Sequence, residues 1–264
     1  DGKLTTGIKD ARCGDVLNAL YEAGAPEEIL YAAKPHIGTD RLREVVPGMR
    51  REIERLGGEV RFSTRLDGVF LRDGRLSGVR LATADGAEEM PCGALVLAIG
   101  QGARDTYQML RDAGVAMQPK PFAVGVRIEH PQTLIDRAQF GDSAGHARLG
   151  AAEYRLTGRS GERGVYTFCM CPGGRVIASA SQNGEVVVNG MSGHRRDAEN
   201  ANAAIVVQVC ENDLPTGPLG GVCFQRELEQ AAFVLGGANA HAPASRVADF
   251  LEKRTPRGFG GVNP

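Results

Sequence analysis

The sequence predicts a mixed fold of helices and strands, α/β in its first part and α+β over the whole chain. Three observations support this prediction. Residues 94–98 form a short, uncharged apolar run followed by glycines, which is typical of a strand buried on both faces. A helical pattern begins at Arg104, directly after those glycines. Residues 164–210 instead contain alternating apolar and polar positions separated by turn residues, which is typical of antiparallel strands.

The composition excludes several classes of protein. The chain has 264 residues, 42% of them hydrophobic and 24% charged, so it can form one large globular domain or two smaller ones. A formal net charge of −1 does not favour nucleic acid as a partner. No apolar run approaches the roughly 20 residues that span a membrane, and no signal-peptide pattern begins the chain. For this reason we expect no membrane partner. The six cysteines are scattered along the chain, which indicates reduced thiols and therefore a cytoplasmic protein.

The first part of the chain predicts helices, then a hairpin, then the apolar strand. Apolar residues at helical spacing predict three helices: residues 10–24, a short one from Pro26, and 39–56. Pro47 should interrupt and kink the third of these. Strands are predicted over residues 59–64, 65–71, 78–81 and 94–98.

The second part predicts a helix, an antiparallel sheet and further helices. The helix that begins at Arg104 is expected to end near Gln118. Further strands are predicted over residues 122–130, 164–171, 175–181, 185–189 and 203–210. Further helices are predicted from Pro131, from Pro218 to the glycines at 236–237, and over residues 243–251.

Three polar residues allow either a functional or a structural role. Arg127 and Glu129 are two residues apart on the strand 122–130, so they share one face. They either hold a polar substrate, which makes Arg127 a weak catalytic candidate, or form an ion pair on a solvated strand face. His36 is predicted to lie in a loop, where it either contacts a ligand or hydrogen-bonds to the backbone.

Cys169 and Cys171 are two residues apart near the end of a predicted strand. In a regular strand their thiols would lie on one face, about 6.5 to 7 Å apart, too far for a relaxed disulfide without backbone bending. No metal is expected, because zinc sites usually space cysteines differently and need two more ligands nearby. The pair is either two small half-buried residues, a redox pair or a site with one reactive thiol. In the last case Cys171, next to the turn, should be the more approachable thiol and a weak catalytic candidate.

Several longer phrases together resemble a little-characterised bacterial family of FAD-dependent dehydrogenases, related to HI0933-like and geranylgeranyl-reductase-like flavoproteins. The phrases are residues 34–42, 96–100, 103–106, 120–132, 168–174 and 188–192. The resemblance implies that residues 1–118 are part of a Rossmann-like FAD-binding domain of the glutathione-reductase type, without its first Gly-x-Gly-x-x-Gly unit. It implies that residues 119–264 are an antiparallel-sheet substrate domain with a truncated end. The chain is therefore expected to be an internal fragment.

The resemblance also implies a function. We expect an FAD-dependent oxidoreductase in which the flavin transfers hydride to or from a small-molecule substrate, with NAD(P)H or another electron carrier as a possible partner. The alternative is a non-catalytic binding module that keeps the fold without the cofactor. A Rossmann enzyme that uses NAD without flavin would need its own fingerprint, which this sequence lacks.

The site residues follow from the same resemblance. The FAD contacts it implies are Leu66, through its backbone, with Ala98, Ile99, Gly100, Gln101 and Arg104. Arg104 either adds positive charge near the pyrophosphate or faces solvent at the start of its helix. The turn after the strand 164–171 is expected on the substrate side of the flavin. The residues concerned are Cys169, Pro172, Gly173 and Gly174.

Overall fold

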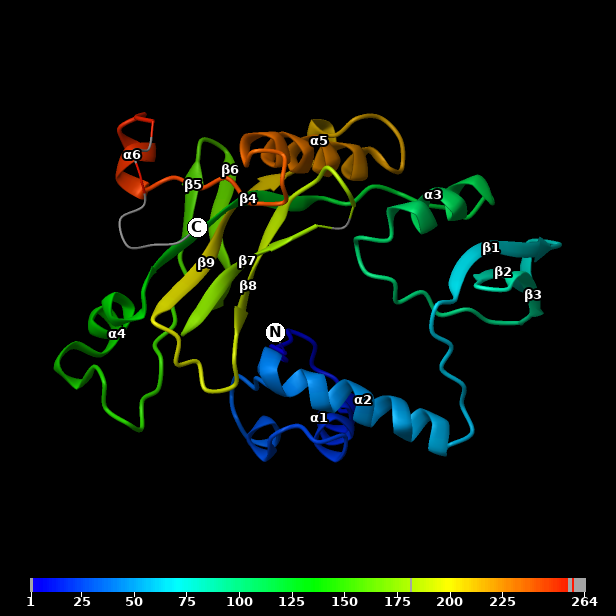
Figure 1. Cartoon of the computed structure of the whole chain (residues 1–264), viewed down its shortest axis with the longest axis horizontal. Helices are drawn as coiled ribbons and strands as arrows, with labels where there is room; N and C mark the ends of the chain where they lie inside the picture. Colours follow the sequence, from blue (N-terminus) through cyan, green and yellow to red (C-terminus); the bar gives the residue numbers. More distant parts are fainter. Residues whose placement is uncertain (1, 181, 256–257, 259–264) are drawn as a thin grey trace. The chain divides into compact units, whose positions relative to one another are not determined.

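The computed structural model describes residues 2–180, 182–255 and 258 (Figure 1). The chain divides into two compact units. Unit 1 comprises residues 1–61, 123–177 and 189–208, and unit 2 comprises residues 62–122, 178–188 and 209–264. The chain therefore passes repeatedly between the units, within strands β4, β7, β8 and β9. The assignment of residues 1–118 and 119–264 to an FAD-binding and a substrate domain stays a prediction.

The described part of unit 1 contains helices, the first three of which surround a small apolar core. They are α1 (Arg12–Glu22), the 3-10 helix η1 (Glu27–Leu30), α2 (Thr39–Arg55), α4 (Gln132–Phe140) and the 3-10 helix η2 (Gly141–Ser143). Ile29, Ile37 and Val45 are fully buried in the core beside α1 and α2. A Cβ atom at Gly48 would lie 2.3 Å from the carbonyl oxygen of Ala23, so glycine allows α2 to approach the end of α1 closely.

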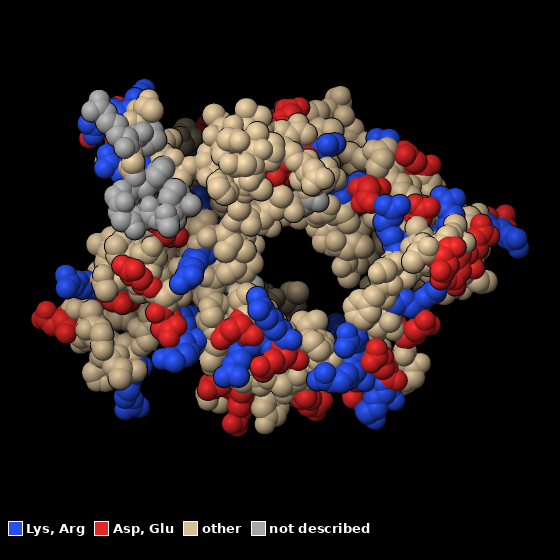
Figure 2. Space-filling view, viewed as in Figure 1, with Lys and Arg blue, Asp and Glu red and all other residues tan. Residues whose placement is uncertain are grey.

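Helix α2 continues through Pro47, so the predicted interruption is wrong. A proline removes only one backbone donor, and the turns on either side keep their own hydrogen bonds. Basic and acidic side chains are intermixed over α1 and α2 (Figure 2). They include the exposed ion pairs Arg41–Glu44 and Arg55–Glu52 of α2, at 3.9 and 2.5 Å.

The main sheet has four strands in the order β4-β9-β6-β5. The strands are β4 (Phe122–Pro131), β5 (Thr157–Ser160), β6 (Arg163–Cys171) and β9 (Asn200–Val209), while β7 (Gly174–Ser179) and β8 (Val187–Ser192) pair separately. The prediction of these strands is confirmed to within about three residues, except for β5. The sequence analysis missed β5 because its four residues are all exposed and carry no apolar alternation.

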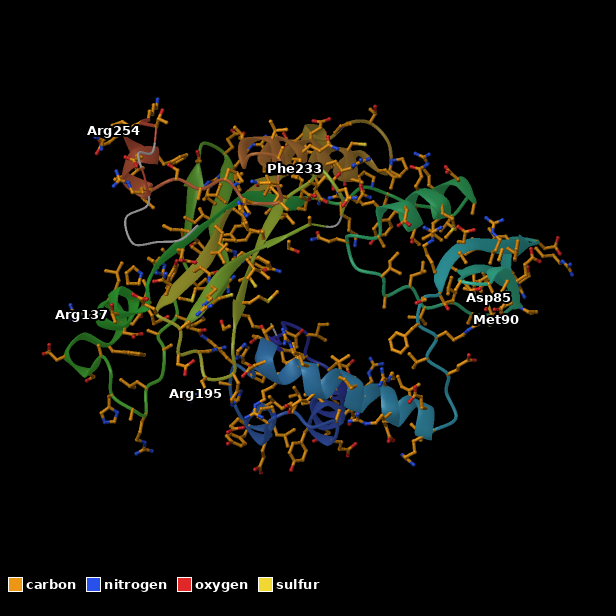
Figure 3. The ribbon with its side chains drawn as sticks, in the orientation of Figure 1. Asp85, Met90, Arg137, Arg195, Phe233 and Arg254 are labelled. Atoms are coloured by element: carbon orange, nitrogen blue, oxygen red, sulfur yellow. The ribbon has the colours of Figure 1, made fainter. Side chains whose placement is uncertain are left out.

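Unit 2 contains a second antiparallel sheet and three α-helices among its described residues. Strands β1 (Arg65–Arg72), β2 (Arg75–Thr83) and β3 (Gly86–Pro91) pair in sequence order, and the helices are α3 (Arg104–Asp112), the 3-10 helix η3 (Glu211–Asp213), α5 (Gly220–Leu235) and α6 (Val247–Leu251). Asp85 and Met90 mark the hairpin of β2 and β3 in Figure 3, and Phe233 marks α5. The mixed fold with antiparallel sheets is thus confirmed.

The apolar run at residues 94–98 is not a strand, contrary to prediction. Its central residue Val96 is 90% exposed, and no strand in the described part of the chain pairs with it. Apolar composition favours burial between neighbouring strands, but it cannot supply those neighbours. Residues 59–64 also lack strand structure, for the same reason.

Helix α3 ends at Asp112 rather than near Gln118. Gly114 has a φ of +81°, a left-handed conformation that terminates helices. Within residues 2–180, 182–255 and 258, no helix combines the length and the apolar character needed to cross a bilayer.

Candidate functional site

The two predicted groups of site residues lie in different units. Arg127, Cys169, Cys171 and the turn residues 172–174 belong to unit 1, whereas Leu66, residues 98–101 and Arg104 belong to unit 2.

A β-bulge at the end of β6 sets the position of the two thiols. Phe168 pairs with Ala204 of β9 and Cys171 with Asn202, so one extra residue of β6 lies between these two pairs. Cys169 has a φ of +47°, which is uncommon for a residue with a side chain. The thiols therefore do not follow regular strand geometry.

Lys3 joins the two thiols. Its Nζ lies 2.9 Å from the Sγ atom of Cys171 and 3.4 Å from that of Cys169. The backbone of Lys3 forms an isolated β-bridge with His36, which holds the lysine at this position. The Cys171 thiol donates a hydrogen bond to the Cys169 carbonyl oxygen at 3.4 Å, and it also interacts with the Cys169 sulfur. The predicted separation of 6.5 to 7 Å assumed a regular strand and is wrong.

The two thiols differ in exposure and acidity. Cys171 is 0% exposed, whereas Cys169 is partly exposed, so the prediction that Cys171 is the more approachable thiol is wrong. The hydrogen bond from Cys171, followed by the charge of Lys3, lowers the pKa of Cys169 to about 5. The same hydrogen bond, together with burial, raises the pKa of Cys171. Negative charge therefore belongs on Cys169 and the proton on Cys171.

Arg127 supports the same cluster from β4. Its Nη1 donates hydrogen bonds to the Asn202 side-chain oxygen at 2.6 Å and to the Cys169 carbonyl oxygen at 3.2 Å. Glu129 instead accepts hydrogen bonds from Asn200 and from the Val176 N–H. The predicted ion pair between Arg127 and Glu129 is therefore wrong, although Glu129 is exposed as a solvated strand face requires. The catalytic role of Arg127 stays a prediction.

His36 lies close to the same charges. The residue is 8% exposed, and neither ring nitrogen has a hydrogen-bond partner in the described structure. Burial, and then the charges of Arg196 and Lys3, lower the pKa of His36 to about 4. The interpretation of His36 as an imidazole hydrogen-bonded to the backbone is therefore wrong, and the backbone hydrogen bonds beside it are formed by its neighbours Pro35 and Ile37.

The turn after β6 adjoins a cavity. Gly173 has a φ of +47°, and a Cβ there would lie 1.7 Å from the Arg196 carbonyl oxygen, so this position requires glycine. The Gly173 N–H donates to the side-chain oxygen of buried Gln132 at 2.8 Å, which anchors the turn. The cavity measures about 410 Å³, and its lining includes Thr39, Gly173, Gly174, Met191, Ser192 and Asp197.

In unit 2 the predicted glycine turn precedes α3. Gly100 has a φ of +67°, and a Cβ there would meet no atom within 4 Å, so the conformation rather than the packing requires glycine. The Tyr107 hydroxyl donates to the Gly100 carbonyl oxygen at 2.8 Å. Leu66 lies at the start of β1, and its neighbour Arg65 is 3.6 Å from Asp105 of α3.

Arg104 does not face solvent, so that alternative is wrong. Its guanidinium is buried and donates to Glu185 at 2.6 Å and to Glu229 at 2.8 Å. Glu185, which is 1% exposed, also accepts from Arg226 at 2.9 Å. Two carboxylates thus already compensate the charge of Arg104.

Comparison with known proteins identifies the family. The family model for FAD-dependent protein, C-terminal domain-like, matches residues 121–264, more than half of the chain. The chain belongs to this family. It is also 51% identical over 267 residues to an uncharacterized protein of Clostridium beijerinckii (strain ATCC 51743 / NCIMB 8052), a match that covers 100% of this chain and 49% of that protein. The chain therefore spans about half the length of the curated relative that it matches.

Membership of the FAD-dependent family confirms the general resemblance noted from the sequence, while the relation to HI0933-like and geranylgeranyl-reductase-like proteins stays a prediction. Sequence reasoning missed Lys3, Asn202, Glu185 and Glu229. Lys3 and the two glutamates have no local signal, because their partners are distant in sequence. Asn202 does have one, since it is a polar residue within a mostly apolar strand.

Proposed function

We propose that this chain is part of an FAD-dependent oxidoreductase that acts on a small-molecule substrate. Family membership supports a flavoprotein-related function. The observation that carries the proposal further is the open glycine turn that leads into α3 of unit 2. The proposal includes a Rossmann-like FAD-binding domain to which residues of this unit contribute.

The residues around this turn suit a phosphate-containing cofactor. In the described structure, the N–H groups of residues 94–101 form no backbone–backbone hydrogen bond, so they are open to a ligand or another strand. The space beside Gly100 is also open, as the missing Cβ contacts indicate. The N-terminus of α3 follows within a few residues, and helix N-termini favour negatively charged groups.

Each predicted residue then has a distinct task. The backbone of Ala98, Ile99, Gly100 and Gln101 would approach the pyrophosphate, and the backbone of Leu66 would contact the adenine. Arg104 would position α3 through its two glutamates rather than neutralise phosphate directly. A bound flavin would supply hydride or electron transfer.

We assign the substrate to the cavity of unit 1. Its lining combines the backbone of Gly173 and Gly174 with polar side chains such as Ser192, and this combination suits a small polar molecule. Cys169 and Pro172 lie on the chain segment that borders it. NAD(P)H or another electron carrier would complete the reaction as electron donor or acceptor.

The first test is the absorbance spectrum of the full-length protein purified without added flavin. We expect flavin absorbance and the release of FAD on denaturation. A colourless protein that also fails to take up added FAD would overturn the proposal and favour the non-catalytic binding module.

A matched pair of variants tests the turn itself. Gly100 and Gly114 both have positive φ, +67° and +81°, and a Cβ at either position meets no atom within 4 Å. Gly100→Ala and Gly114→Ala should therefore each cost about 1 kcal/mol of stability. Only Gly100→Ala should lower the FAD content of the purified protein. Equal flavin content in both variants would remove the turn from the cofactor site.

A further inference from the structure

We propose that Cys169 and Cys171 form a redox-active dithiol that reacts with aliphatic disulfides. Cys169 is the attacking thiolate, Cys171 is the buried thiol that resolves the mixed disulfide, and Lys3 stabilises negative charge on both sulfurs. The proposal does not depend on the flavin, because neither step of the exchange passes electrons to it.

The backbone places both sulfurs against the same ammonium group. The bulge and the left-handed conformation of Cys169 place both sulfurs around the single ammonium of Lys3, at 3.4 and 2.9 Å. A non-glycine residue in this conformation is strained, and such residues concentrate at functional sites.

The surroundings of the dithiol form a built site. A Cβ at Gly190 would lie 2.2 Å from the Asn202 side-chain oxygen, 2.4 Å from Arg127 Nη1 and 2.7 Å from Cys171 Sγ, so the absence of a side chain lets these three groups meet. Asn202 is 0% exposed, and its side-chain nitrogen has no hydrogen-bond partner in the described structure. A buried amide without a partner is costly, and here it adjoins the resolving thiol.

The environment separates the roles of the two cysteines. Cys169 is partly exposed, so an incoming disulfide can reach its sulfur, and the low pKa of about 5 keeps it as thiolate at neutral pH. Cys171 is fully buried and keeps its proton, because its pKa is raised. Arg127 binds the Cys169 carbonyl oxygen at 3.2 Å and so helps to hold the bulge.

The exchange is balanced in atoms and electrons. The Cys169 thiolate attacks a disulfide RSSR, forming a Cys169–S–SR bond and releasing RS⁻. The Cys171 thiol gives its proton to RS⁻, and its sulfur attacks the Cys169 sulfur. The Cys169–Cys171 disulfide forms as a second RS⁻ leaves. The protein dithiol is oxidised by two electrons, and RSSR is reduced to RSH and RS⁻.

The first experiment treats the full-length protein with oxidised glutathione and maps the products by mass spectrometry. We expect a Cys169–Cys171 disulfide in the wild type and a stable glutathione adduct at Cys169 in Cys171→Ser. In Cys169→Ser, Cys171 should react more slowly than exposed Cys210. Adducts confined to Cys210 and Cys223, or a glutathione adduct at Cys169 of the wild type that is never resolved, would overturn the proposal.

The second experiment requires no cysteine substitution. The rate of alkylation by iodoacetamide is measured at each cysteine of the full-length protein at pH 6 and pH 8. The rate at Cys169 should change less than twofold, whereas a cysteine of ordinary pKa slows on the order of 50- to 100-fold at pH 6. Lys3→Gln should slow Cys169 at pH 6, and the exposed control Lys9→Gln should not. A Cys169 profile that matches that of Cys210 would overturn the proposal.

Discussion

Each unit contains a buried polar cluster, and the two clusters solve the problem of buried charge differently. In unit 2 the Arg104 cluster (Arg104, Glu185, Arg226 and Glu229) pairs two cations with two anions at 2.6 to 2.9 Å. In unit 1 the Cys171 cluster (Lys3, Arg127, Cys169, Cys171 and Asn202) surrounds two sulfurs with cations. There Arg127 bonds only to neutral oxygens in the contacts that the structure describes.

The backbone differs as well. Cys169 adopts a left-handed conformation, whereas Arg104 begins a regular helix. A charge-balanced network on regular backbone needs no role beyond holding elements together. Cations that face an ionisable thiol on strained backbone perturb its acidity, and that combination indicates chemistry. The partners of a buried charge, rather than its burial, therefore distinguish a structural network from a functional site.

The largest expected effect is on the Arg104 cluster. Glu185→Gln should lower the free energy of unfolding by on the order of 3 kcal/mol, because it removes the more deeply buried of the two carboxylates that compensate Arg104. The measurement is urea unfolding of the full-length protein, followed by circular dichroism. Glu52→Gln is the control, since Glu52 forms an exposed ion pair with Arg55 and should contribute less than about 1 kcal/mol. Equal losses of unfolding free energy in Glu185→Gln and Glu52→Gln would contradict the interpretation of the Arg104 cluster as a structural network.

The next effect is a pH dependence of unit 1. The pKa of His36 is lowered from 6.5 to about 4, so between these values the unfolded state binds more protons than the folded state. Stability is therefore lost as the pH falls from 6.5 toward 4, by about 2 to 3 kcal/mol.

His36→Gln should remove this part of the pH dependence of unfolding, as measured by urea titrations at pH 7 and pH 4.5. The exposed His241 provides the control His241→Gln, which should leave the slope unchanged. An unchanged slope in His36→Gln would show that burial and the charges of Arg196 and Lys3 do not lower the pKa of this ring.

Gly190→Ala tests whether the packing of the Cys171 cluster sets the acidity of Cys169. The added methyl group overlaps the atoms of Asn202, Arg127 and Cys171, and such overpacking costs about 1 to 3 kcal/mol. It should also shift the pH profile of Cys169 alkylation toward that of Cys210, because the cluster must rearrange. Gly158→Ala is the control, since a Cβ there meets nothing within 4 Å. An unaltered Cys169 profile in Gly190→Ala would separate the thiol chemistry from the packing around Gly190.

The smallest effect is expected for Arg226→Gln. Arg226 binds the same Glu185 as Arg104 does, but its side chain is 47% exposed. Loss of this outer cation should cost about 0.5 to 1 kcal/mol in urea unfolding, because Arg104 still compensates Glu185. A cost as large as that of Glu185→Gln would mean that the network depends on its exposed member.

The sequence predicted much of the fold and part of the site. Alternation and turn residues predicted β4, β6, β7 and β9, and helical spacing predicted α1, α2 and α5. The phrase at residues 168–174 marked the segment that carries Cys169 and Cys171 and borders the cavity. The apolar run at residues 94–98 was wrongly predicted to be a strand, because a strand also requires neighbours to pair with.

The sequence by itself determined the local elements, the glycine turns and the family resemblance, because these depend on residues close together in the chain. Only the tertiary structure decided which thiol is acidic. Lys3 reaches Cys169 across a sequence separation of 166 residues, and the bulge that presents Cys169 arises from the pairing of β6 with β9. Local propensity predicts neither contact, since both depend on how distant segments pack together.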